Sequence, residues 1–161
     1  MCASIFLYLQ KDFEDLSLMQ EKIMQTFLPY ESFEETAKVL DNKRLGKQRV
    51  ETLQIATILA GKSQSKAWSN HPAVNQWRGY LGHLILYGLI MCEEWIKRGY
   101  KDTCTKKIGD LYIVGQDTKP FWLGNDEYHA SHRSNLLKKD FKFYSKYNWQ
   151  EPNDLPYVWP L

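Results

Sequence analysis

The sequence NHPAVNQWRGYLGHLILYGLIMCEEWIKRG, residues 70–99, repeats apolar side chains at intervals of three and four. That interval is the period of one face of an α-helix. Asn70 is the expected N-cap, Pro72 is tolerated in a first turn, and Gly99 follows a basic last turn as a stop signal. The apolar face consists of Val74, Trp77, Leu81, Leu84, Gly88, Met91, Cys92 and Trp95. We therefore expect one long helix that serves as the central scaffold of a mostly α protein.

Two shorter helices are expected before this scaffold. Ser32 and Glu35 have the spacing of a capping box, which predicts a short helix that ends near Asp41. Apolar positions from Leu45 onward predict a second helix, and Gly61 is expected to end it in a left-handed conformation.

The chain after the scaffold is expected to be less regular. Glycines and prolines punctuate residues 100–124, which we interpret as an ordered loop with two possible short strands at 110–114 and 121–123. Asn125 is expected to open a last helix. The final segment PNDLPYVWPL, residues 152–161, is too rich in proline for a helix and too apolar for solvent, so we expect it to pack back over the domain.

The composition is that of a single soluble globular domain, because 43% of the 161 residues are hydrophobic and 25% are charged. A formal net charge of +2 permits a nucleic-acid partner without requiring one. Three cysteines without a CxxC pair argue against a disulfide framework or a zinc site, and no apolar run is long enough for a membrane span. We expect a cytoplasmic monomer in which residues 1–23 form an N-terminal extension and residues 24–161 form one domain. Met24 is an alternative start of translation.

The first candidate for chemistry is LDNKRLGKQRVE, residues 40–51, in which four cations surround one acid. Those cations are expected to keep Glu51 ionised and, with the helix N-terminus, to form an anion site able to hold phosphate. The alternative is an ordinary solvated helix start. The cations are Lys43, Arg44, Lys47 and Arg49.

The second candidate is the stripe formed by His129, His132 and Arg133, which share one face of the last helix. A metal is not expected, because the stripe lacks the spacing and the glutamate of known helical metal motifs. The stripe is expected to line a buried polar site that binds phosphate or holds a catalytic acid in place. Histidines that only support helix packing are the alternative.

The third candidate is AWSNHPAVNQWRGY, residues 67–80. Aromatic rings stack on unpaired bases, and asparagine or arginine side chains read base edges. A tryptophan-rich piece of the core is the alternative. The residues concerned are Trp68, Asn70, His71, Trp77, Arg78 and Tyr80, and a basic patch of Lys138, Lys139, Lys142 and Lys146 follows the histidine stripe.

Four segments together resemble the pyrimidine dimer DNA glycosylase family, the phage endonuclease V type and its cellular relatives. They occur in the family's order, before a closing DLPYVWPL, and are LDNKRLGKQRVETLQ, KAWSNHPAVNQWRGY, CEEWIKRGYKDT and YHASHRSNLLKKDFKFY. The resemblance implies a compact helical domain that flips a base out of damaged double-stranded DNA and cleaves its N-glycosidic bond. It implies neither a metal nor a cofactor.

The resemblance also implies roles for individual residues. Glu51 corresponds to the glutamate that assists cleavage at C1′, and Arg44, Lys47 or Arg49 corresponds to phosphate-binding arginines. The pieces containing Arg78 and the histidine stripe correspond to the scaffold and the wall of the site.

The nucleophile is where this chain departs from the family. The phage enzyme uses its free N-terminal amine, whereas 23 residues precede the matching start here. We therefore favour hydrolysis by water over strand cleavage through a Schiff base, with Lys43 or Lys47 as the alternative attacking amine. Two other functions remain open, a non-catalytic DNA-binding module and an N-glycoside hydrolase acting on free nucleosides or nucleotides.

Overall fold

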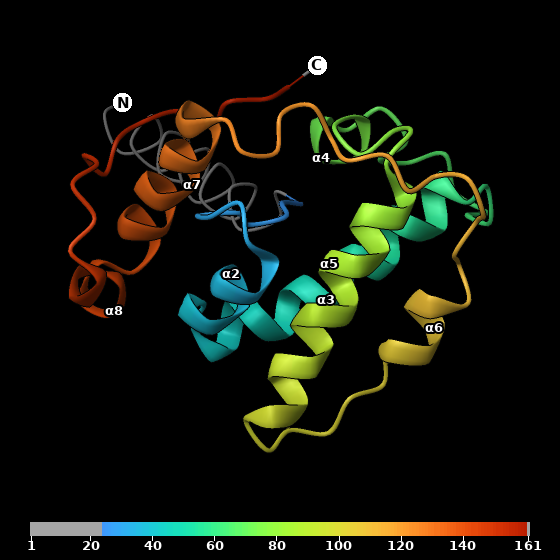
Figure 1. Ribbon diagram of the computed structural model, residues 1–161, viewed down its shortest axis with the longest axis horizontal. Helices are drawn as coiled ribbons and strands as arrows, with labels where there is room; N and C mark the ends of the chain where they lie inside the picture. The colour runs from blue at the N-terminus through green and yellow to red at the C-terminus, as the bar shows by residue number, and fades with distance from the viewer. Residues whose placement is uncertain (1–23, 161) are drawn as a thin grey trace, which may run out of the picture.

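The computed structural model describes residues 24–160 of the chain, so the expected extension of residues 1–23 lies outside the described residues. Within residues 24–160 every regular element is helical and no strand is present, which confirms the expected mostly α fold (Figure 1). The elements are α2 (Phe33–Val39), α3 (Asn42–Leu59), α4 (Pro72–Asn75), α5 (Leu81–Lys97), α6 (Thr105–Gly109), α7 (Asp126–Lys139), α8 (Phe141–Tyr144) and the 3-10 helix η1 (Ser145–Tyr147).

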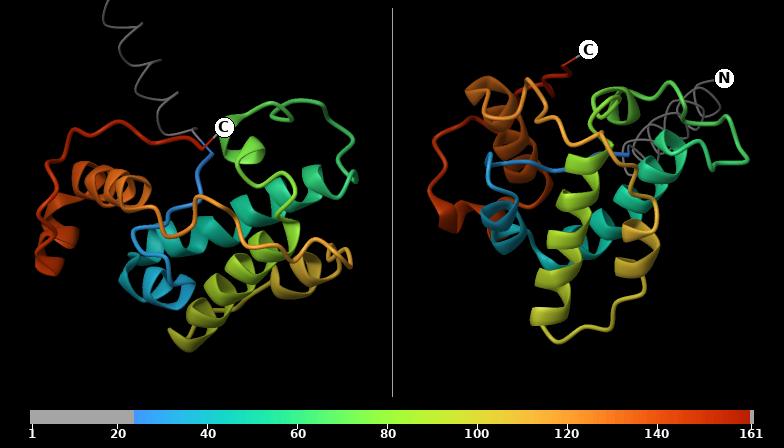
Figure 2. Two further views of the ribbon diagram at one scale, coloured as in Figure 1. Left: turned by 45° about the horizontal axis from the view of Figure 1, so that its top comes forward. Right: turned by 45° about the vertical axis from the view of Figure 1, so that its right-hand side comes forward.

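The two longest helices, α3 and α5, pack against each other and form the centre of the fold (Figure 2). Glycines allow their close approach, because a Cβ at Gly88 would overlap the methyl group of Thr52 and a Cβ at Gly46 would press on the Trp95 ring. The start of one helix therefore lies beside the end of the other. The apolar residues of both helices join one hydrophobic core.

The prediction of one continuous helix across residues 70–99 is wrong in its first third. Helix α4 ends after Asn75, and Gly79, with a φ of 83°, turns the chain before α5 begins at Leu81. Only glycine adopts that backbone conformation readily. The N-cap of α4 is His71, whose Nδ1 accepts a hydrogen bond from the Ala73 N–H at 3.0 Å, and not Asn70.

The other expected helix boundaries are confirmed. The Ser32 hydroxyl accepts from the Glu35 N–H at 3.1 Å and caps α2, and the Asn125 side chain caps α7. Gly61 follows α3 with a φ of 70°. Residues 100–124 differ from the expectation in one respect, because they contain the short helix α6 and no strand. Cys104 is the N-cap of this helix, and Asp102, two residues earlier, accepts from the Thr105 N–H at 2.8 Å.

Residues 24–29, which we call the N-proximal segment, pass through the middle of the molecule without regular structure. Side chains from several helices hold its backbone in place. The Phe27 N–H donates to Gln48 of α3 at 3.0 Å, and the Phe27 carbonyl accepts from the Tyr87 hydroxyl of α5 at 2.8 Å. On the other side, two histidines of α7 form hydrogen bonds with the backbone of Leu28. The segment therefore links the α3–α5 pair to α7.

The C-terminal tail, residues 150–160, packs back over α7 as expected. The Leu155 N–H donates to the Ser134 hydroxyl at 3.0 Å, and the Val158 N–H donates to the Ser131 hydroxyl at 3.2 Å. These contacts bring Tyr157 over the ring of His132, with centroids 5.2 Å apart.

Candidate active site at Glu51

Glu51 lies in the middle of α3 and is only 5% exposed. Its Oε2 accepts a hydrogen bond from the Gln48 side chain at 2.9 Å, and Lys47 Nζ lies 3.5 Å from Oε1. The backbone N–H of Gln25, in the N-proximal segment, is a third hydrogen-bond donor to this carboxylate. Helix α3 and the N-proximal segment therefore hold the acid from two sides.

Burial raises the pKa of Glu51 above its ordinary value, and Lys47, the Gln25 N–H and Gln48 only partly oppose that rise. Burial therefore outweighs the surrounding cations in setting the pKa of this group, whereas the sequence analysis considered the cations alone. Two of the four cations are engaged elsewhere, because Arg44 pairs with Asp41 at 2.8 Å and Arg49 pairs with Asp102. A carboxyl group whose pKa is raised in this way is suited to proton transfer.

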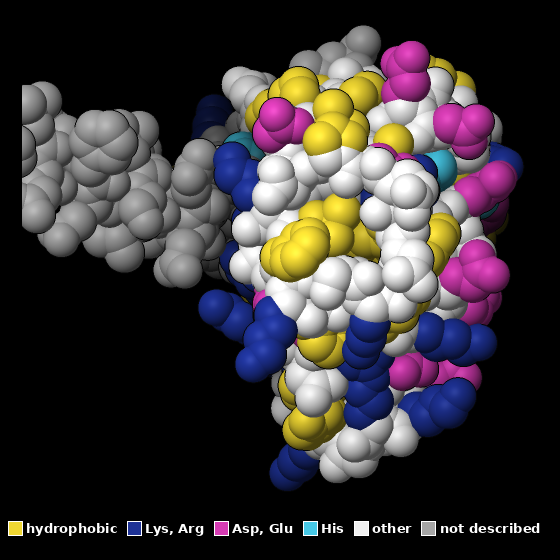
Figure 3. All heavy atoms as spheres, turned by 90° about the vertical axis from the view of Figure 1, so that its left-hand side faces the viewer, with side chains coloured by type: hydrophobic (Ala, Val, Ile, Leu, Met, Phe, Trp, Pro, Cys, Tyr) yellow, Lys and Arg dark blue, Asp and Glu magenta, His cyan; other side chains and the backbone are white. Residues whose placement is uncertain are grey.

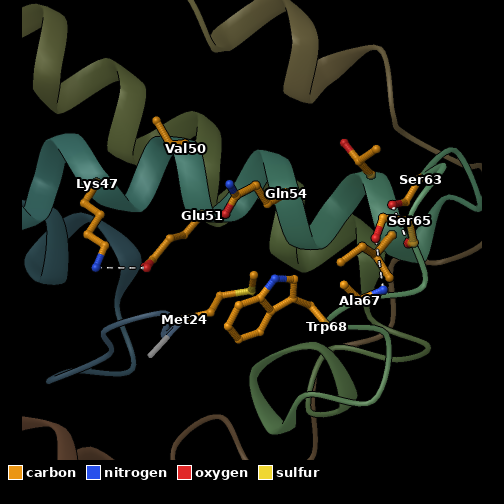
Figure 4. A pocket seen from close by; sticks show the side chains of 11 residues that line it. Met24, Lys47, Val50, Glu51, Gln54, Ser63, Ser65, Ala67 and Trp68 are labelled. Carbon is orange, nitrogen blue, oxygen red and sulfur yellow. Dashed lines mark hydrogen bonds and ion pairs between the residues drawn. The ribbon is translucent and has the colours of Figure 1, made fainter. Parts of the chain in front are cut away.

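An apolar cavity of about 530 Å³ opens on one side of Glu51 (Figure 4). Met24 and Trp68 face each other below α3 at this cavity, and Glu51 with its partner Lys47 lies at one end (Figure 4). The lining residues are Met24, Lys47, Val50, Glu51, Gln54, Thr57, Ile58, Ser63, Ser65, Ala67 and Trp68.

Trp68 is the most unusual residue of the apolar cavity. It is 49% exposed, and its φ of 71° places a bulky residue in the left-handed region. Such a conformation costs of order 1–3 kcal/mol and is concentrated at functional sites. Its ring lies 5.3 Å from that of His71. Trp68 therefore presents an aromatic face at the cavity, although exposing this ring to water and adopting a positive φ are both unfavourable.

A second cavity, of about 680 Å³, opens on the other side of Glu51. We call it the basic cavity, because five of its lining residues are lysine or arginine. Glu51 and Lys47 line both cavities and so separate them. The lining residues are Gln25, Phe27, Lys43, Arg44, Lys47, Glu51, Asn135, Lys138, Lys139, Asp154, Leu155, Pro156 and Tyr157.

The cations of the basic cavity lie close enough to repel one another. Desolvation, Arg44 and Lys47 together lower the pKa of Lys139, and Glu51 opposes them only in part. The face of the molecule that carries α7 and α8, on the left in Figure 1, displays several lysine and arginine side chains (Figure 3). An excess of cations over acids is the electrostatic signature of an anion-binding surface.

The candidates from residues 40–51 are thus divided between two faces of α3. Arg44, Lys47 and Glu51 reach the cavities, whereas Arg49 points to the opposite side. The Arg49 guanidinium stacks over the Trp95 ring at 4.4 Å and pairs with Asp102. Residues two apart on a helix do not share a face, so helical spacing alone could have separated Arg49 from Lys47 and Glu51.

The histidine stripe forms hydrogen bonds with the backbone of the N-proximal segment. His129 Nδ1 donates to the Leu28 carbonyl at 2.8 Å, and His132 Nδ1 accepts from the Leu28 N–H at 3.2 Å. Arg133 donates to the Pro29 carbonyl at 2.7 Å and pairs with Glu151 of the tail. Burial lowers the pKa of His132 to about 3, so this ring is neutral. None of the three lines the apolar or the basic cavity.

The candidates from residues 67–80 are separated by burial. Trp77 is completely buried, and its Nε1 donates to the Thr26 hydroxyl at 3.0 Å, which fixes the N-proximal segment. Asn70 and Arg78 are exposed near α4, and the Arg78 Nε donates to Asn75 at 2.9 Å. His71 contacts Trp68. The structure therefore places Trp68 at a cavity and Trp77 in the core.

Gln25 and Tyr157 are two residues of the basic cavity that the sequence analysis missed as site residues. They come from opposite ends of the described chain, and no motif connects them. The family resemblance could have pointed to both residues. Gln25 lies next to the start of the matching region at residue 24, and Tyr157 lies within the closing DLPYVWPL.

No group of three or more His, Cys, Asp or Glu side chains in residues 24–160 is arranged to hold a metal ion. In the same part of the chain, no helix combines the length and the apolar character that a membrane crossing needs.

The fold and the site define a helical protein with a buried carboxylate between an apolar cavity and a basic one, an arrangement suited to acid–base chemistry on an anionic ligand. The sequence model of the pyrimidine dimer DNA glycosylase family matches residues 24–108, more than half of the chain, and the protein belongs to that family. This finding confirms the resemblance seen in the sequence. Comparison with curated proteins and with solved structures gave no match.

Proposed function

We propose that the protein is a DNA N-glycosylase that removes a damaged or modified base, a pyrimidine dimer according to its family, with Glu51 as the catalytic carboxylate. The observation that carries this proposal is the position of Glu51, buried between the apolar cavity and the basic cavity. Double-stranded DNA presents an apolar base and anionic phosphates on either side of the sugar carbon that reacts. The two cavities match these two parts.

The apolar cavity is the proposed site for an everted base. Its volume of about 530 Å³ lies in the range of small-ligand pockets. Enzymes that act on a base take it out of the stack and hold it against aromatic or apolar side chains. Trp68 offers such a face at the mouth of the cavity.

The basic cavity is the proposed site for the DNA backbone. Lysine and arginine side chains position nucleic acid by contacts with phosphate oxygens and give no sequence preference of their own. Arg44 and Lys139 supply charge from α3 and α7, respectively, to the same cavity. Lys47, beside Glu51, is close to both the proposed backbone site and the reacting sugar.

The proposed reaction is hydrolysis through an oxocarbenium-like sugar. The C1′–N bond breaks as the water oxygen bonds to C1′, and the bond electrons leave with the base. Glu51 stabilises the developing positive charge and accepts a proton from the water, and that proton is then available to the departing base. The raised pKa of Glu51 favours this exchange of a proton.

Water is the proposed nucleophile because the nitrogen of the N-proximal segment that contacts the Glu51 carboxylate is the backbone nitrogen of Gln25. The nitrogen at Gln25 is a peptide N–H in the chain described here, and it donates a hydrogen bond to the carboxylate. A peptide nitrogen is not a nucleophilic amine, whereas a chain that starts at Met24 and loses that methionine would present Gln25 with a free amine, so both forms are assayed. Trapping with borohydride separates this route from attack by Lys43 or Lys47.

The test is cleavage of the N-glycosidic bond, called base release here, in ultraviolet-irradiated and undamaged duplex DNA. The two bases of a dimer stay joined after one glycosidic bond breaks, so cleavage is read as strand breaks after mild alkali opens the abasic sites. The proposal predicts alkali-dependent breaks in irradiated DNA only, no product trapped by borohydride, and loss of release in Glu51→Gln. Spontaneous strand breaks with a trapped product would replace water by an amine and leave Glu51 in place.

The two other functions give different results in the same experiment. A non-catalytic module binds DNA, releases no base, and is indifferent to Glu51→Gln. A hydrolase of free nucleosides or nucleotides ignores duplex DNA, and its activity depends little on salt because no bound counterions are released.

A further inference from the structure

Two buried hydrogen-bonding groups in the basic cavity have no partner among the described residues. They are the side-chain amide nitrogen of Gln25 and the hydroxyl of Tyr157. The other buried groups without a partner, on Arg49, Thr52 and His132, line neither cavity. Buried polar atoms in folded proteins are nearly always satisfied, so two exceptions in one cavity beside Glu51 need a cause.

The group left open at Gln25 is a donor. The side-chain oxygen of Gln25 already accepts from the Thr26 N–H at 2.9 Å, and its backbone carbonyl accepts from Gln48 at 3.0 Å. Its backbone N–H is engaged with Glu51. Gln25 is only 2% exposed, so its side-chain NH₂ is held in place with no acceptor.

The open group at Tyr157 is also a donor, and it is equally well fixed. The Tyr157 ring lies between the rings of His132 and Trp159, at centroid distances of 5.2 and 5.7 Å. Burial raises the pKa of the hydroxyl, which therefore keeps its proton at neutral pH. The charges of Arg44 and Glu51 both act on it, and all three residues line the basic cavity.

Two neutral donors among cations require a ligand that is rich in acceptors and anionic. A phosphodiester oxygen meets both conditions, whereas a base edge presents donors as well as acceptors. We propose that Gln25 and Tyr157 bind one phosphate group of the substrate backbone in the basic cavity and thereby position the adjoining sugar at Glu51. This inference rests on the proposed function and names two positioning residues for it.

Tyr157→Phe tests the inference, because it keeps the ring and removes only the hydroxyl. The probe is a duplex that carries a tetrahydrofuran abasic analogue, with affinity measured by fluorescence anisotropy. Losing a hydrogen bond to a charged group is expected to weaken binding about tenfold or more. The slope of log affinity against log salt stays unchanged because the hydroxyl is uncharged, whereas Lys139→Ala is expected to reduce that slope by about one. Gln25→Met is expected to weaken binding in the same way as Tyr157→Phe.

Melting temperatures separate a positioning role from a structural one. The Tyr157 hydroxyl has no partner to lose, so Tyr157→Phe is expected to melt at the same temperature or higher. Tyr128→Phe is the matched control, because the Tyr128 hydroxyl is buried and donates to Gln76 at 3.1 Å. That control is expected to melt lower and to bind the duplex normally.

A lower melting temperature with normal affinity in Tyr157→Phe would overturn the inference, and so would no change in either quantity. Base release tells the two proposals apart. Release by the wild type together with unaltered binding and release in Tyr157→Phe removes the inference alone. No release by the wild type, with weakened binding in Tyr157→Phe, removes the glycosylase alone. A wild type that does not bind the duplex contradicts both.

Discussion

Two buried carboxylates lie against opposite faces of α3, and their surroundings differ. Asp102 pairs with Arg49 and accepts hydrogen bonds from the Cys104 N–H at 3.0 Å and from the Thr105 hydroxyl at 2.6 Å. Burial would raise its pKa, but the hydrogen bonds from Thr105 and Arg49 outweigh burial and hold the pKa well below the usual range. Glu51 has fewer partners, faces two cavities, and has a raised pKa.

These different surroundings indicate that Asp102 stabilises the fold, whereas Glu51 is available for chemistry. Asp102 joins α6 to α3, and its ionised form is the stable one. Glu51 is destabilised by its own burial, a property that folding alone does not require and that catalytic sites often show.

The largest expected effect is the loss of base release in Glu51→Gln, by about 10²–10⁴-fold, the usual contribution of a general acid or base. The variant is expected to melt at the same temperature or higher, because the new amide oxygen still accepts from Gln48 and no buried charge remains. Single-turnover base release and thermal melting measure the two quantities. Glu94→Gln on α5, where Glu94 pairs with Arg98 away from the cavities, is the control that should release base normally.

The second prediction concerns stability. Asp102→Asn leaves the Arg49 guanidinium buried without its counter-charge, which typically costs about 3–5 kcal/mol of the free energy of unfolding. Denaturation by urea measures this loss, and base release at low temperature should stay within a few-fold of the wild type. Asp110→Asn, which removes an exposed pair with Lys106, should leave stability nearly unchanged. Equal stability of Asp102→Asn and the wild type would remove the structural role from Asp102.

The third prediction extends the contrast to the wall of the apolar cavity. Trp68→Gly removes the ring and gives the position a residue that accepts its φ of 71°. We expect KM for irradiated DNA to rise about tenfold, since stacking on a base is worth about 1–3 kcal/mol. The melting temperature should stay the same or rise. Trp68→Phe keeps an aromatic face and should stay closer to the wild-type KM, whereas an unchanged KM in Trp68→Gly would place the base elsewhere.

The smallest expected effect is the pH dependence of stability, which has opposite signs for the two acids. The folded pKa of Glu51 is raised above 4.5, so its ionisation destabilises the folded state as pH rises through that window. The advantage of Glu51→Gln in free energy of unfolding should therefore grow as pH rises above 4.5. The folded pKa of Asp102 is lowered below 3.8, so its contribution is complete above that value and is lost as pH falls through the folded pKa. Urea melts of Glu51→Gln above pH 4.5 and of Asp102→Asn below pH 3.8 measure the two trends, and a trend of the same sign in both would contradict the contrast.

The sequence predicted the helices of the fold better than it predicted which charged side chains form ion pairs with each other. Caps such as Ser32 and Asn125 and the face of α5 follow from local patterns, and the structure confirms them. The break at Gly79 was missed because Val74 and Trp77 continue the apolar period into the same core across the turn. A helical repeat of apolar residues indicates which side chains are buried, but it does not require that they lie on one continuous helix.

The candidate site was only partly predictable for a related reason. Glu51 and Lys47 are one helical turn apart, so their contact follows from spacing. Arg49 pairs with an acid 53 positions away, and Tyr157 reaches the cavity from the end of the chain. Long-range contacts of this kind leave no periodic trace in one sequence.

The most direct test of the account is a structure of the Glu51→Gln variant bound to a duplex that holds a pyrimidine dimer. We expect a base in the apolar cavity against Trp68, a phosphate group in the basic cavity, and C1′ of the target nucleotide about 3–4 Å from the substituted side chain. DNA bound to another face, with both cavities empty of nucleotide, would contradict it.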